Sequence, residues 1–268
     1  MKPLIHFAHA NGVPSLVYRK LFDLLKDDFD IIYVPLLGTD RRYPIDDGWK
    51  SLTQQVIDSI VQQAKGRPVI GLGHSLGSVV TFQAAYQRPE LFQQVIMLDP
   101  PLIVGKASLL MHLTKMFNPK LLDKITPANL SLKRRDHWES RQQAYDLLRP
   151  KGFYQLFDEQ CFQDYIDYAL TDDPVRGGVT LTISKYDEVE IFRTNTTKMW
   201  LPMLKPPVDM HLVVGRDSPF LKQKFPQQLQ KKLSIPFSIT DGGHMFPLEH
   251  PKEVVDLVKS LIQKSSLT

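Results

Sequence analysis

The pattern Gly-x-Ser-x-Gly at residues 73–77 puts Ser75 between an apolar run, residues 69–72, and a helix-like run, residues 78–86. A strand, a sharp turn and a helix in this order hold a serine hydroxyl exposed at the turn, where it can act as a nucleophile. Gly73 and Gly77 lack a Cβ, so the strand and the helix can approach closely. The alternative is an ordinary glycine-rich turn between a buried strand and a helix.

A serine hydroxyl needs a base that takes its proton, and the base needs an acid that fixes its tautomer. His244 follows two glycines on the loop after the last predicted strand, and it alone fits the chain order serine, acid, histidine. We therefore predict His244 as the base. The other histidines lie in predicted strands, turns or helices: His6, His9, His74, His112, His137, His211 and His250.

Two aspartates are candidates for the acid, because each follows a predicted strand between Ser75 and His244. Asp217 comes after the strand at residues 212–214, and its position and chain order favour it. Asp99 ends the strand at residues 95–98 and is the alternative. Each could also be an ordinary turn aspartate.

Backbone N–H groups must stabilise the negative oxygen that develops when the serine attacks a carbonyl group. One donor is expected from Leu76, immediately after the nucleophile, and the other from the loop that follows the first strand. That loop is formed by residues 9–12, and we predict Asn11 as the second donor.

Strand-like and helix-like stretches alternate on both sides of this pattern. This alternation predicts a parallel sheet with helices on both faces. Strands are predicted at residues 4–8, 30–34, 69–72, 95–98, 210–214 and 236–240, and helices at 18–25, 46–65, 78–86, 219–232 and 251–262. Residues 102–205 contain helix-like pieces without that alternation, and prolines flank them, so we predict an inserted helical lobe.

The composition is that of an ordinary globular protein, with 43% hydrophobic and 23% charged residues in a chain of 268. The net charge is +4, but the densest basic clusters, residues 133–135 and 231–232, are too short for a nucleic-acid footprint. The single cysteine, Cys161, is predicted to be a small buried residue and favours a reducing compartment. With no signal-length apolar segment or membrane span, we expect a cytoplasmic protein.

Together these features resemble the α/β-hydrolase-fold serine hydrolases, in particular capped enzymes similar to esterases and lipases. The resemblance rests on the turn at residues 9–12, the pattern at 73–77, the strand-end Asp217 and the pair Gly243-His244. Ala10 stands where the family usually has glycine, and the chain starts directly on the strand that carries this turn. The resemblance implies a mostly parallel sheet of about six strands in a core of residues 1–101 and 206–268. It also implies that residues 102–205 form a helical cap inserted after the strand ending at Asp99.

The resemblance further implies transfer of an acyl group from an ester or thioester to Ser75 and then to water. The substrate is expected to be small to medium and partly apolar, because the predicted cap is rich in aromatic residues and methionine. No cofactor or metal is expected, and the chain is expected to be a monomer or dimer. Two alternatives stay open: a lyase or carbon–carbon-bond hydrolase with the same triad, and a non-catalytic ligand-binding protein.

The acidic run Asp187, Glu188 and Glu190 has two interpretations. It could bind the amino group of a substrate, or it could be the solvated face of a helix. The second interpretation is favoured, because clustered charges on a helix usually face water.

Overall fold

A six-stranded sheet with the order β2-β1-β3-β4-β8-β9 forms the centre of the computed structural model, which describes residues 1–265. Every neighbouring pair of strands in it is parallel, so the predicted parallel sheet is confirmed. Its strands are β1 (Leu4–Ala8), β2 (Asp30–Tyr33), β3 (Val69–His74), β4 (Phe92–Leu98), β8 (Asp209–Gly215) and β9 (Phe237–Thr240).

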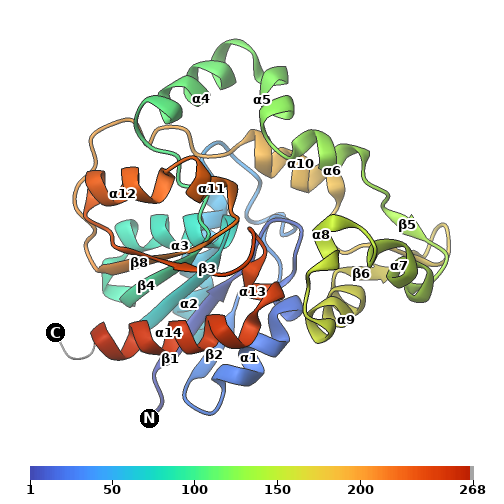
Figure 1. Ribbon diagram of the computed structural model, residues 1–268, viewed down its shortest axis with the longest axis horizontal. Coiled ribbons are helices and arrows are strands. Elements are labelled where there is room, and N and C mark those ends of the chain that lie inside the picture. Colours follow the sequence, from blue (N-terminus) through green and yellow to red (C-terminus); the bar gives the residue numbers. More distant parts are fainter. Residues whose placement is uncertain (266–268) are drawn as a thin grey trace.

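Helices cover both faces of this sheet, as the alternation predicts (Figure 1). One face carries α1 (Arg19–Leu25) and α14 (Pro251–Ser265). The other carries α2 (Lys50–Ala64), α3 (Leu76–Gln87) and α12 (Phe225–Leu233). Four single-turn pieces lie in the connections: η1 (Ser15–Tyr18), η2 (Pro89–Leu91), α11 (Pro219–Lys222) and α13 (Phe246–Glu249).

Strand β1 shows why the central strands read as continuous apolar runs. All five of its residues are buried, because successive side chains point to opposite faces and both faces are covered. Phe7 packs in the core under α1 and α14, and Ala8 packs in the core under α2 and α3. The carboxyl ends of the strands therefore meet at one edge, where their loops are held by a rigid sheet.

The segment between β4 and β8 contains seven helices and a small second sheet. The helices are α4 (Gly105–Phe117), α5 (Pro119–Ile125), α6 (Ala128–Lys133), α7 (Arg141–Leu148), α8 (Gly152–Gln155), α9 (Glu159–Tyr168) and α10 (Lys185–Arg193). The antiparallel strands are β5 (His137–Trp138), β6 (Leu170–Asp172) and β7 (Val179–Leu181). The sequence analysis missed this sheet because strands of two or three residues are too short to show alternation.

Cys161 is buried in α9, as predicted, and burial raises the pKa of its thiol to about 12. It packs as a small apolar side chain within the core formed by α9 and α1. None of the helices within residues 1–265 is long and apolar enough to cross a membrane.

Three histidines are completely buried around the carboxyl edge and the first strand, and burial keeps each of them neutral. It lowers the pKa of His6 to about 3, of His9 to about 4 and of His74 to about 3. In the unfolded chain a histidine has a pKa near 6.5. At a pH between these lowered pKa values and about 6.5, the unfolded chain therefore binds more protons than the folded protein.

We predict that the free energy of unfolding falls as the pH is lowered below about 6.5, by up to about 4 kcal/mol per pH unit for three such histidines. Urea unfolding between about pH 7 and about pH 5 measures this slope. In His6→Asn the slope should be smaller by about a third, because one titrating group is gone. A free energy of unfolding that stays constant over this range would contradict the assignment.

Candidate active site

Ser75 lies in the sharp turn between β3 and α3, and its backbone takes the left-handed φ of 52°. The two glycines of the pattern make this turn possible. A Cβ on Gly73 would lie 2.5 Å from the Gly77 backbone, and a Cβ on Gly77 would lie 2.0 Å from the carbonyl oxygen of Ala8. The close approach of β3, α3 and β1 therefore requires glycine at both positions and holds Ser75 at the carboxyl edge of the sheet.

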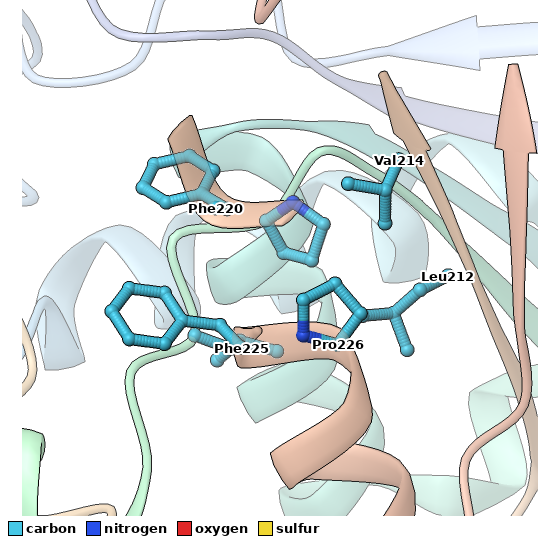
Figure 2. A pocket seen from close by; sticks show the side chains of 7 residues that line it. Leu212, Val214, Phe220, Phe225 and Pro226 are labelled. Atoms are coloured by element: carbon cyan, nitrogen blue, oxygen red, sulfur yellow. The ribbon is translucent and has the colours of Figure 1, made fainter. Parts of the chain in front are cut away.

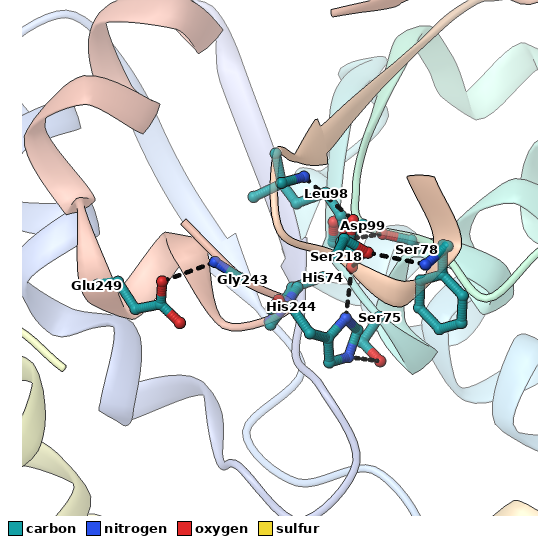
Figure 3. A network of polar contacts seen from close by, with 12 residues as sticks. His74, Ser75, Ser78, Leu98, Asp99, Ser218, Gly243, His244 and Glu249 are labelled. Atoms are coloured by element: carbon teal, nitrogen blue, oxygen red, sulfur yellow. Dashed lines mark hydrogen bonds and ion pairs between the residues drawn. The ribbon is translucent and has the colours of Figure 1, made fainter. Parts of the chain in front are cut away.

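His244 reaches Ser75 from the loop that follows β9. Its Nε2 lies 3.0 Å from the Ser75 Oγ, and both residues are half-buried (Figure 3). Two features shape this loop: Gly242 takes a φ of +100°, and the Gly243 N–H donates to the Glu249 carboxylate at 2.9 Å. The structure thus brings together the serine and the histidine that the sequence analysis singled out.

The carboxylate that contacts His244 belongs to Asp99. Its Oδ2 lies 2.6 Å from the His244 Nδ1, and it also accepts hydrogen bonds from the Ser218 Oγ at 2.7 Å and, through Oδ1, from the Gly215 N–H at 3.2 Å. Asp99 is fully buried. A buried carboxylate at this position fixes the imidazole with its proton on Nδ1 and leaves Nε2 free to accept from the serine.

The sequence analysis preferred Asp217, and this was wrong: the carboxylate that lies against His244 is that of Asp99. After β8 the chain makes a turn closed by a hydrogen bond from the Ser218 N–H to the Gly215 carbonyl oxygen. This turn points Ser218 inward to Asp99 and leaves Asp217 exposed, with its N–H bonded to the Gly242 carbonyl oxygen. Both aspartates follow strands in the required chain order, so strand-end position alone did not distinguish them.

His74 is a further residue at this edge to which the sequence analysis gave no role. Its Nδ1 accepts a hydrogen bond from the Tyr18 hydroxyl at 2.6 Å, and its Nε2 donates to the carbonyl oxygen of His244 at 2.9 Å. Tyr18 is also fully buried, so both hydrogen bonds are shielded from water. The pair Tyr18–His74 therefore fixes the main chain of the residue whose side chain contacts Ser75.

The loop at residues 9–12 is tied to the start of α3. The Gly77 N–H donates to the carbonyl oxygen of His9 at 3.0 Å, and the His9 Nε2 accepts from the Leu37 N–H at 2.7 Å. Leu76 begins α3, where the first backbone N–H groups have no partner within the helix. Leu76 and Asn11 remain the predicted oxyanion donors.

The far side of the same loop contacts α10. The Asn11 Nδ2 donates to the carbonyl oxygen of Glu188 at 3.0 Å, and the Glu188 side chain packs against Gly12. Glu188 is 3% exposed and forms an ion pair with Arg134 at 2.8 Å. The solvated-face interpretation of the acidic run was therefore wrong for Glu188, which is part of a buried ion pair.

An apolar cluster supports the other side of the site. The ring of Phe220 stands edge-on to His244 with 5.3 Å between the ring centroids. Behind it, Phe225, Pro226 and the end of β8 line a small apolar pocket (Figure 2). Phe220 therefore presents an apolar surface beside the imidazole.

Comparison with known proteins identifies the family of the chain. Residues 7–257 match the model of the Alpha/beta hydrolase family, so the chain belongs to this family. It is accordingly an α/β-hydrolase-fold enzyme.

Two relatives and one solved structure are similar to it. The uncharacterized hydrolase YugF of Bacillus subtilis (strain 168) is 24% identical over 252 residues, which cover 92% of this chain and 85% of that protein. The type I acyl-CoA thioesterase mpaH of Penicillium brevicompactum is 24% identical over 216 residues, covering 68% of this chain and 47% of that protein. The peroxisomal alpha-beta-hydrolase Lpx1 of Saccharomyces cerevisiae superposes with a TM-score of 0.77 at 18% identity, covering 100% of this chain and 78% of that one.

We predict that Asp99→Asn lowers the rate at which Ser75 reacts by about 10³- to 10⁴-fold, because the imidazole loses the carboxylate that fixes its tautomer. The rate of p-nitrophenyl ester hydrolysis measures this. Asp217→Asn is the matched control, and it should retain the wild-type rate because its side chain is exposed. Loss of activity in Asp217→Asn alone would reverse the assignment.

For His74 we predict that replacement by Phe lowers the same rate about ten- to a hundredfold, because the His244 main chain loses its donor and the imidazole shifts. Tyr18→Phe should have a smaller effect in the same direction. His211→Phe, on β8, is the control, since the His211 Nε2 bonds to the Ser238 hydroxyl on β9 and not to a residue of the site. Equal rates in His74→Phe and wild type, with the fold retained by circular dichroism, would show that His74 has no positioning role.

Proposed function

We propose that this chain is a serine hydrolase that cleaves an ester or thioester bond through Ser75, His244 and Asp99. The observation that carries the proposal is the continuous hydrogen-bonded series from the Ser75 Oγ through the imidazole to the buried carboxylate, at 3.0 and 2.6 Å. Three such groups in series are the arrangement that activates a serine hydroxyl.

In the first step the Ser75 Oγ attacks the carbonyl carbon of the substrate while the His244 Nε2 takes the hydroxyl proton. The imidazolium that forms is stabilised by the neighbouring Asp99 carboxylate. Collapse of the tetrahedral intermediate breaks the bond to the alcohol or thiol, which leaves with the proton from Nε2. An acyl group then remains on Ser75.

In the second step a water molecule gives a proton to the His244 Nε2 and attacks the acyl carbon. The bond to the Ser75 Oγ breaks, the serine recovers its proton, and the carboxylic acid leaves. In both steps the negative oxygen of the intermediate is held by the backbone N–H groups of Leu76 and Asn11. Such donors contribute about 10²- to 10³-fold each to the rate.

The substrate is a small to medium acyl compound that is partly apolar. The aromatic ring of Phe220 lies beside His244, which favours a substrate with an apolar group next to the reacting carbonyl. A thioester is one candidate, because a relative is a type I acyl-CoA thioesterase, although this chain spans only 47% of that protein. We take residues 102–205 as the cap that encloses the substrate and residues 1–101 and 206–268 as the core.

A reducing compartment such as the cytoplasm fits the chain, since its one cysteine is buried in the reduced form. Monomer and dimer are both compatible with the proposed chemistry, because Ser75, His244 and Asp99 come from one chain.

We predict that a fluorophosphonate probe labels the wild-type protein at Ser75, because the activated Oγ attacks phosphorus as it attacks a carbonyl carbon. Ser75→Ala should abolish labelling, and Ser78→Ala is the control, since the Ser78 hydroxyl is buried and bonded to the Gly73 carbonyl oxygen. Absence of labelling in folded wild type would favour a non-catalytic ligand-binding protein.

A panel of p-nitrophenyl esters and acyl thioesters of increasing chain length then identifies the acyl group. Turnover that rises and falls with chain length would support the hydrolase and report the pocket size. A uniformly very low rate in a protein that the probe labels would instead favour a lyase or a carbon–carbon-bond hydrolase.

A further inference from the structure

Helices α4, α5 and α6 expose more large apolar side chains than an ordinary surface helix does. Leu110, Leu113 and Phe117 lie on one side of α4 and are 66%, 40% and 77% exposed. The side that faces the protein carries the buried Met111 together with Ser108 and His112, which bond to Thr197. An ordinary surface helix buries its apolar side and exposes its polar side.

Helix α5 buries Leu122 but, like α6, also exposes leucine side chains. Leu121 is exposed on α5, and Leu130 and Leu132 are exposed on α6, where Leu130 reaches 74%. The residues of α6 that face the protein are Ala128 and Ser131, which are small. We call the seven exposed side chains of these helices together the apolar outer face: Leu110, Leu113, Met116, Phe117, Leu121, Leu130 and Leu132.

The three helices are anchored so that this face stays outward. On α4, the Lys115 Nζ donates to the carbonyl oxygen of Asn195 at 3.0 Å, in addition to the bonds from Ser108 and His112. On α5, Asp123 forms an ion pair with Arg193 of α10 at 2.7 Å. Turning the apolar side chains inward would break these contacts, so the exposure belongs to the folded state.

The surroundings of the apolar outer face carry a net positive charge. Residues 105–135 contain seven lysines and arginines, of which Lys115 and Arg134 pair with Asp47 and Glu188, and one acidic residue, Asp123, which pairs with Arg193. Lys106, Lys124 and Lys133 are exposed on the same three helices. Exposed apolar side chains interspersed with lysine are the arrangement by which helices lie in the interface of an anionic membrane.

We propose that α4, α5 and α6 dock on a lipid bilayer that carries anionic headgroups, with the apolar outer face inserted among the acyl chains. Figure 1 shows α4 and α5 at one extremity of the molecule, beyond the sheet, where a flat surface can reach them. The apolar side chains stand out singly from short helices, and a fluid interface accommodates such protrusions without a matching pocket. The inference goes beyond the proposed function and does not depend on it.

A second copy of the chain fits this face less well. In a twofold dimer the same surface meets itself, so two basic regions would be brought together. Like charges at such short range repel and destabilise the contact. Anionic headgroups supply the complementary charge instead, and the cytoplasmic leaflet of membranes carries such lipids.

Vesicle sedimentation tests the proposal with the full chain. Wild type should bind vesicles of phosphatidylcholine and phosphatidylserine in equal parts and should bind pure phosphatidylcholine vesicles weakly. The variant Leu113→Ser/Phe117→Ser/Leu130→Ser should bind the mixed vesicles at least about tenfold more weakly, because less apolar surface enters the bilayer. The variant Lys106→Glu/Lys124→Glu/Lys133→Glu should also lose binding, most clearly at low salt.

Val175→Ser is the matched control, since Val175 is 90% exposed in the connection between β6 and β7, outside the three helices. Circular dichroism and the midpoint of urea unfolding check that each variant is folded. Failure of wild type to bind mixed vesicles, or equal binding by the apolar variant, would overturn the proposal. Self-association of wild type that the apolar variant loses, without vesicle binding, would identify a second copy as the occupant.

Discussion

The buried carboxylate of Asp99 joins the parts of the chain on which the site depends. It directly follows β4, and it accepts hydrogen bonds from the last residue of β8, from the turn after β8 and from the loop after β9. Leaving a buried carboxylate without partners costs several kcal/mol, so its three donors keep these segments in one arrangement. The same contacts that stabilise the edge of the sheet therefore set the position of the imidazole.

Backbone packing provides the second constraint. Gly77 lets α3 start directly against β1, and Gly215 lets the end of β8 approach the Gly243 carbonyl oxygen, where a Cβ would lie at 2.3 Å. His74, at the end of β3, then bonds to the main chain of His244 on the loop after β9. The serine and the histidine are 169 residues apart in sequence, and these short-range contacts bring them together.

The sequence predicted the main sheet, its helices, Ser75 and His244 because each has a local signal: alternation of apolar runs, a spaced pair of glycines, or a glycine pair before the histidine. The choice between Asp99 and Asp217 had no local signal. It depends on which side of a turn faces inward, and the hydrogen bond between Ser218 and Gly215 decides that. The small sheet and the ion pair of Arg134 with Glu188 were missed for the same reason, since they form between distant short segments.

The last helix between β4 and β8, α10 (Lys185–Arg193), is hydrogen-bonded to loops of the central sheet. Its residue Glu188 accepts from Asn11, and near its end the carbonyl oxygens of Ile191 and Thr194 accept from the Trp49 indole and the Gly48 N–H. These bonds fasten α10 to the loops after β1 and before α2. A chimera that borrows the insertion of a related enzyme should therefore be joined ahead of α10, near Ser184, so that the native helix continues to brace the loop beside Ser75.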